Sequence, residues 1–185
     1  ITPHGYDILC VYDYRCITDA PEIDLEVFGT DYKRRFLFAW SFGVWAAEKT
    51  FVGRHFDRAI AFNGTPYPMD DAVGLGARRV EATIRGLQLG GMESFEEKAY
   101  GPFYEDMKPY LSPRSLGDNI IELEHLSRES SKPYDKTLIW HRGIVGTRDQ
   151  IWPVENTYRY WGGLAEREPL PHYPFADKRI VEKEV

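Results

Sequence analysis

Ser41, Asp149 and His172 are residues whose types and order could support hydrolysis by a nucleophilic serine. A serine hydroxyl becomes a nucleophile when a histidine accepts its proton and an acidic side chain orients that histidine. Where a sharp strand-to-helix turn carries the serine, the order along the chain is serine, acid, histidine. The three residues follow this order, so the sequence predicts a catalytic triad.

Ser41 lies in the segment AWSFG at residues 39–43, between an apolar run and a stretch of good helix formers. Small residues two before and two after the serine suit a tight strand-to-helix turn, because strand and helix crowd there. The helix start would direct the backbone amide of Phe42 toward a developing oxyanion. Ser41 as a simple helix N-cap is the alternative, but its place between strand and helix favours the nucleophile.

Asp149 and His172 occupy positions expected for the partners of such a serine. Asp149 follows the apolar run that ends at Gly146, which places it just beyond the C-terminal edge of a sheet. His172 comes later, in a loop with prolines on both sides. Taken alone, Asp149 fits a turn or cap residue and His172 fits a surface histidine. The ordered set favours the triad.

The elements that must position these residues are short apolar runs. They are continuous rather than alternating, as is typical of parallel strands covered on both faces. With a helix predicted over 44–55, they favour an α/β fold whose mostly parallel sheet is flanked by helices. The runs are residues 8–12, 36–40, 59–62, and 138–140 continuing to 144–146.

Residues of about 70–135 interrupt this alternation, because the connection is far longer than usual between neighbouring strands. Helices are predicted over 80–89, 94–104 and 116–129, with Ser94 as an N-cap. We interpret this stretch as a small helical cap inserted into a single domain spanning 1–185. The N-terminal strands of that domain are expected to lie upstream of Ile1.

Composition excludes several other classes. With 43% hydrophobic and 15% aromatic residues among 185, the chain can bury one core. The net charge of −6 argues against nucleic-acid binding, and no apolar run approaches the ~20 residues of a membrane span. Cys10 and Cys16 cannot supply a disulfide framework. No metal or cofactor is expected, since Asp70-Asp71 is typical of a solvated turn and the glycines near residue 75 lack a dinucleotide-loop pattern.

Motifs over nearly the whole chain resemble those of the BioG-type esterases of biotin synthesis. They are YDYR at residues 12–15, AWSFGVWAA at 39–47, FNGTPYP at 62–68, GTRDQIWP at 146–153 and HYPF at 172–175. The resemblance implies an α/β-hydrolase fold with a small helical cap, acting in the cytoplasm without a cofactor. It also implies Ser41 as nucleophile, His172 as base and Asp149 as its partner.

The substrate implied by the resemblance is the methyl ester of pimeloyl-acyl carrier protein, hydrolysed to the free acid and methanol. Trp40, Phe103 and Tyr104 are then expected to contact the acyl chain. The family's early loop, which lends a second amide to the oxyanion, has no match here.

Acyl carrier proteins are acidic, so the partner is expected to dock on local basic residues. The candidates Arg78, Arg79 and Arg85 belong to one predicted helix, on which Arg78 and Arg85 share a face. The alternative for each arginine is a solvated helix face.

Two other functions fit the same residues. One is a different acyl esterase or thioesterase with this triad, and the other is a catalytically idle hydrolase-fold protein that binds an acyl chain or a partner.

Overall fold

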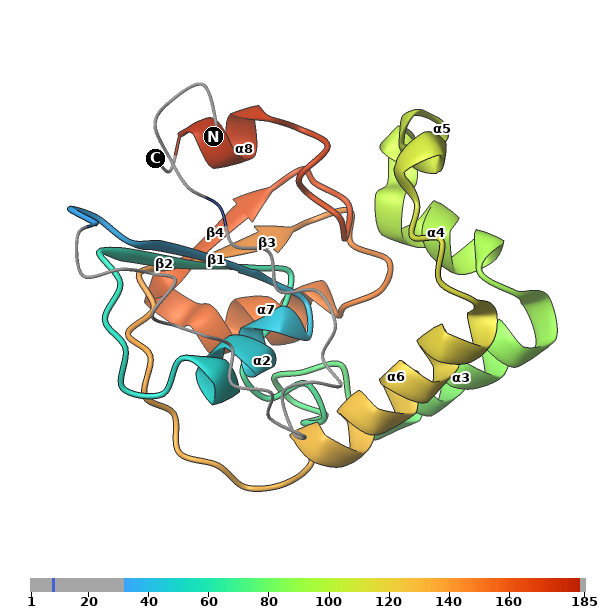
Figure 1. Cartoon of the computed structure of the whole chain (residues 1–185), viewed down its shortest axis with the longest axis horizontal. Coiled ribbons are helices and arrows are strands. Elements are labelled where there is room, and N and C mark those ends of the chain that lie inside the picture. Colours follow the sequence, from blue (N-terminus) through green and yellow to red (C-terminus); the bar gives the residue numbers. More distant parts are fainter. Residues whose placement is uncertain (1–7, 9–31, 184–185) are drawn as a thin grey trace.

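A parallel β-sheet lies at the centre of the computed structural model, which describes residue 8 and residues 32–183 (Figure 1). Its described strands are β1 (Phe36–Trp40), β2 (Arg58–Phe62), β3 (Arg142–Gly146) and β4 (Ala165–Glu168), side by side in that order. All three pairs are parallel. Their C-terminal ends therefore meet at one edge, and the predicted α/β arrangement is confirmed.

The strand predictions hold for β1 and β2 and fail in part for β3. Residues 138–140 are not a strand, because the buried carboxylate of Glu48 accepts hydrogen bonds from the backbone of Thr137 and Leu138 and from Trp140 Nε1. Strand β4 was not predicted, since its sequence, Ala-Glu-Arg-Glu, is charged. The run at 8–12 lies outside the described residues apart from residue 8.

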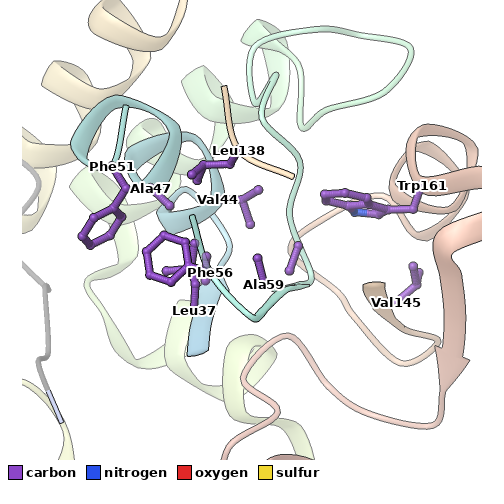
Figure 2. Packing of buried hydrophobic residues seen from close by; sticks show 11 residues of the cluster. Leu37, Val44, Ala47, Phe51, Phe56, Ala59, Leu138, Val145 and Trp161 are labelled. Carbon is purple, nitrogen blue, oxygen red and sulfur yellow. The ribbon is translucent and has the colours of Figure 1, made fainter. Parts of the chain in front are cut away.

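Helices cover both faces of the sheet. Helices α2 (Gly43–Thr50) and α7 (Val154–Trp161) pack on one face, and the short α8 (Arg179–Glu182) lies on the other (Figure 1). Figure 2 shows Val44 and Ala47 of α2, with Trp161 of α7, over the sheet residues Ala59 and Val145. On the opposite face Ile180 of α8 joins a second cluster. Helix α2 ends before the predicted residue 55, and Gly53 follows it with φ 68°.

The predicted helical stretch is present between β2 and β3. It consists of α3 (Ala77–Gly90), α4 (Glu93–Tyr100), α5 (Tyr104–Met107) and α6 (Leu116–Ser130), with 3-10 turns at Gly101–Phe103 and Lys108–Tyr110. Helix α4 begins at Glu93, so Ser94 is not its N-cap; Ser115 is the N-cap of α6 and accepts from the Asp118 amide. No helix in the described residues is long and apolar enough to cross a bilayer.

The base of this cap is fixed to the helix that follows Ser41. Trp45 and Ala46 of α2 share an apolar cluster with Val80 of α3 and Leu126 of α6. Figure 1 shows α3 and α6 running side by side away from the sheet, with α4 and α5 at their outer end. A single domain over 1–185 remains a prediction.

Candidate active site

Ser41 lies in a strained turn at the C-terminal end of β1. Its φ is 56°, in the left-handed region that few non-glycine residues adopt, and such strain is common at functional sites. The Ser41 amide donates to Phe62 O at 2.9 Å, and Ser41 O accepts from the Val44 amide at 3.1 Å. The turn thus links β1, β2 and the first turn of α2, which is the expected nucleophile geometry.

Gly64 leaves room for this turn. A Cβ atom on Gly64 would lie 2.3 Å from Ser41 O and 2.9 Å from Ser41 Cα, far inside van der Waals contact with rigid backbone. The motif at residues 62–68 contains Gly64, but nothing in the residue types indicated that Gly64 would lie against the backbone of Ser41.

We expect Gly64→Ala to lower the free energy of unfolding by about 3 kcal/mol, because backbone must shift to accept the methyl group. The same shift should abolish reaction of Ser41 with a fluorophosphonate. Chemical denaturation and probe labelling measure both effects. Gly90→Ala is the matched control, since apart from its chain neighbours and the nearby backbone of α3 no described atom lies within 4 Å of its Cβ position. A Gly64→Ala protein as stable and reactive as this control would contradict the prediction.

The three predicted triad residues form one chain of hydrogen bonds. His172 Nε2 is 3.1 Å from Ser41 Oγ, and His172 Nδ1 is 2.8 Å from Asp149 Oδ2. A carboxylate only accepts hydrogen bonds, so Nδ1 carries the proton and the lone pair of Nε2 faces the serine hydroxyl. This is the arrangement a general base requires.

Burial and backbone contacts fix the side chains of Asp149 and His172. His172 is 2% exposed, and the side chain of Asp149 is 3% exposed. Asp149 Oδ1 accepts from the amides of Ile151 and Trp152, at 2.8 Å each, which leaves Oδ2 for the imidazole. The carboxylate is therefore held in a turn directly after β3.

Asn63 holds the histidine loop against the sheet, a role that sequence reasoning missed. Its Nδ2 donates to Pro171 O and His172 O, both at 2.8 Å, while its Oδ1 accepts from the Gly146 amide at 2.6 Å. Asn63 is 2% exposed and has φ 48°, a conformation that asparagine tolerates better than most residues. Its position directly after β2, at the same edge as Ser41, was the signal available.

Trp40 also contacts His172. Its Nε1 donates to His172 O at 2.7 Å, and the two rings lie 5.2 Å apart between centroids. The ring of Tyr173 packs edge-on against Trp40 at 5.4 Å. These contacts position the histidine loop, and an additional contact of Trp40 with substrate remains a prediction.

The other residues predicted to contact substrate, oxyanion or carrier protein lie on several different elements. Phe42 precedes α2, so its amide is one of the helix-start donors without an intrahelical acceptor, and its role at the oxyanion remains a prediction. Phe103 lies in a 3-10 turn, while Tyr104 is buried beneath the ammonium group of Lys108. Arg78 and Arg85 are exposed on α3. Their substrate and docking roles remain predictions.

A cavity of about 260 Å³ lies beside the acid loop. Side chains from α3 and α4 line it, together with Gln150 and Ile151, which directly follow Asp149. Arg79 lines this cavity, whereas the lining does not include Phe103 or Tyr104. In the described part of the chain, no group of three or more His, Cys, Asp or Glu side chains could hold a metal ion.

Comparison with known proteins places the chain in a family. Residues 1–171 match the sequence model of the family described as pimeloyl-ACP methyl esterase BioG. The chain belongs to the BioG family. The match ends one residue before His172, so the family assignment and the hydrogen bonds of that histidine are separate observations.

Individual relatives agree with BioG membership. A crystal structure of BioG from Haemophilus influenzae superimposes with a TM-score of 0.77 at 26% identity, covering 90% of this chain and 77% of that one. An uncharacterised protein from Haemophilus influenzae is 31% identical over 95% of the chain and 81% of its own length. A Bacteroides fragilis protein named malonyl-[acyl-carrier protein] O-methyltransferase is 28% identical over 98% of the chain. The chain spans 37% of that protein's length.

Proposed function

We propose that this BioG-family protein is a serine esterase that hydrolyses the methyl ester of pimeloyl-acyl carrier protein. The observation that carries the proposal is the continuous contact from Ser41 Oγ through His172 to Asp149, at 3.1 and 2.8 Å. Family membership supports the substrate, and the triad supports acyl transfer to water.

The geometry supports a two-step mechanism. His172 Nε2 takes the proton as Ser41 Oγ attacks the ester carbonyl, and Asp149 stabilises the imidazolium that forms. The Phe42 amide donates to the oxyanion. Methanol leaves with the proton from His172, and a water molecule activated by the same imidazole then releases the acyl group from Ser41.

The name of the Bacteroides fragilis relative describes methyl transfer to a carrier-bound malonyl group. Because this chain spans 37% of that protein, the name covers a much longer polypeptide. A nucleophilic serine removes a methyl ester rather than forming one, so we assign this chain the hydrolytic direction. A cytoplasmic location and the absence of nucleic-acid or membrane partners remain predictions.

Product analysis tests the proposal against its alternatives. With methyl-pimeloyl carrier protein as substrate, mass spectrometry should show the carrier losing one CH₂ unit, with methanol released and the thioester intact. Release of the free carrier thiol would indicate a thioesterase instead. No change in the carrier would leave only an acyl-binding protein. Rescue of a biotin auxotroph that lacks this esterase would test the pathway in cells.

Docking of the acidic carrier on α3 gives a kinetic prediction. Reversing Arg78, Arg79 and Arg85 to glutamate should raise KM for the carrier-bound ester about tenfold or more, because the exposed patch changes sign. The salt dependence of KM should weaken as well. Hydrolysis of p-nitrophenyl acetate should be nearly unchanged, since that ester needs no docking.

Arg54→Glu is the matched control. This exposed arginine lies between α2 and β2, at the edge of the sheet where the strands begin, whereas Ser41 lies where they end. Equal loss on both substrates would show damage to the fold or the site. An unchanged KM for the carrier ester would exclude α3 as the docking helix.

A further inference from the structure

The outer end of the cap contacts the loop that carries His172. The backbone amide of Tyr173 donates to Ala99 O, in the last turn of α4, at 2.8 Å. The rings of Tyr100 and Tyr173 lie 4.8 Å apart between centroids. A backbone hydrogen bond and a ring contact therefore join α4 to the residue that directly follows His172.

Gly101, which ends α4, contacts the residue that directly precedes His172. A Cβ atom on Gly101 would lie 3.0 Å from Pro171 Cβ and 3.8 Å from Pro171 Cγ. Pro171 is buried, and its ring is closed onto its own backbone, so it cannot turn aside. Residues 99–101 of the cap thus contact both chain neighbours of His172.

The sheet and the cap hold different atoms of this loop. From the sheet, Asn63 donates to the carbonyl oxygens of Pro171 and His172, and Trp40 Nε1 also donates to His172 O. From the cap, α4 accepts the hydrogen bond of the Tyr173 amide. Carbonyl contacts on one side leave the loop able to tilt about them, and the amide contact on the other side prevents this tilt.

Small displacements of the loop matter because the imidazole of His172 needs both of its hydrogen bonds at once. Its Nε2 lies 3.1 Å from Ser41 Oγ, and its Nδ1 lies 2.8 Å from Asp149 Oδ2. A misplacement of about 1 Å in a catalytic group can cost about 10²-fold in rate. Contacts on both neighbours of His172 can therefore change turnover through the position of its ring.

We propose that the outer end of the cap positions the catalytic base, so that Ser41 is fully reactive only while residues 99–101 are docked on the loop of His172. Tyr100 and Gly101 are positioning residues, which act through Tyr173 and Pro171. The inference rests on the proposed function, because His172 is a base only in that mechanism. It gives the cap a part in the chemical step, in addition to any part in binding the carrier protein or the acyl chain.

Two glycines give a matched test, because they share one backbone conformation. Gly101 has φ 54° and ψ −126°, and Gly162, which ends α7, has φ 51° and ψ −117°. Alanine is strained equally at both, but apart from its chain neighbours and the adjoining helix backbone no described atom lies within 4 Å of the Gly162 Cβ position. Gly101→Ala should lower kcat for p-nitrophenyl acetate about tenfold, with KM changed less than about twofold. Gly162→Ala should lose as much thermal stability and keep its kcat.

Tyr100 gives a second test that leaves the backbone unstrained. Tyr100→Ala removes the ring contact with Tyr173 and should also lower kcat about tenfold, whereas Tyr100→Phe retains the ring and should keep wild-type kcat. Wild-type kcat in either Gly101→Ala or Tyr100→Ala would overturn the inference. An equal loss in Gly162→Ala would overturn it as well, since backbone strain would then be the cause. A raised KM at unchanged kcat would also overturn it, because these residues would then bind substrate.

Imidazole ¹⁵N NMR spectra separate this inference from the proposed function, because they require no ester. The His172 nitrogens of the wild type should report a proton on Nδ1. Gly101→Ala and Tyr100→Ala should move these signals toward the average of the two tautomers, and Tyr100→Phe and Gly162→Ala should not. Wild-type signals in all four variants would refute the positioning and leave the esterase intact. The expected losses with p-nitrophenyl acetate, without hydrolysis of methyl-pimeloyl carrier protein, would support the positioning and refute the proposed substrate.

Discussion

Ser41→Ala is expected to lower kcat for the methyl ester by about 10⁶, because removing the nucleophile of a triad eliminates the covalent pathway. Reaction with a fluorophosphonate probe should disappear completely. The fold should persist, since the hydrogen bonds from the Ser41 amide to Phe62 O and from the Val44 amide to Ser41 O use backbone atoms. Turnover and labelling are measured on protein whose circular dichroism matches that of the wild type.

Ser131→Ala is the matched control for this change. Its hydroxyl donates to Ser127 O at 2.7 Å on an exposed part of the cap base. The control should keep full labelling and full turnover. Labelling that persists in Ser41→Ala would assign the reactive hydroxyl to a different residue.

His172→Ala is expected to lower kcat by about 10⁶, as much as Ser41→Ala, since Ser41 loses its proton acceptor. Asp149→Asn should cost about 10⁴ by the same reasoning, because an amide NH₂ facing Nδ1 favours the tautomer that carries its proton on Nε2. The amide retains an oxygen for the Ile151 and Trp152 amides, so stability should change little. Steady-state kinetics and thermal unfolding of both variants measure these effects.

Two other histidines differ in how well they serve as controls for His172→Ala. His125 lies on α6, in the cap, next to Arg128, and His125→Ala should keep nearly full kcat. His141 is less suitable, because its Nδ1 accepts from the Ala59 amide at 3.0 Å and continues the pairing of β2 with β3. Wild-type kcat in either triad variant would remove that residue from the mechanism.

The sheet was predictable where burial on both faces demands apolar residues. Strand β1 lies beneath α2 and is apolar throughout, so the prediction over 36–40 matched it. Strand β4 pairs only with β3 among the described strands, and it carries Glu166, Arg167 and Glu168. A charged strand of this kind has no hydrophobic pattern from which to predict it.

The site was predictable where side-chain chemistry is distinctive. Serine, histidine and aspartate in a fixed order at strand ends can be found from residue types. Asn63 acts through the carbonyl oxygens of Pro171 and His172, and Gly64 acts through the absence of a side chain. Neither role can be predicted from residue type, because each depends on which backbone segments the fold brings together.

The bonds of Asn63 join parts of the chain that are synthesised far apart in time. Asn63 emerges from the ribosome early, but the carbonyl groups that it holds lie 108 and 109 residues later. Closing such a loop costs on the order of 4 kcal/mol of chain entropy, which the docked loop must offset. A nascent chain that carries β1, β2 and the whole cap has Ser41 but not yet His172. The proposed esterase activity should therefore appear only once the segment around His172 has left the exit tunnel.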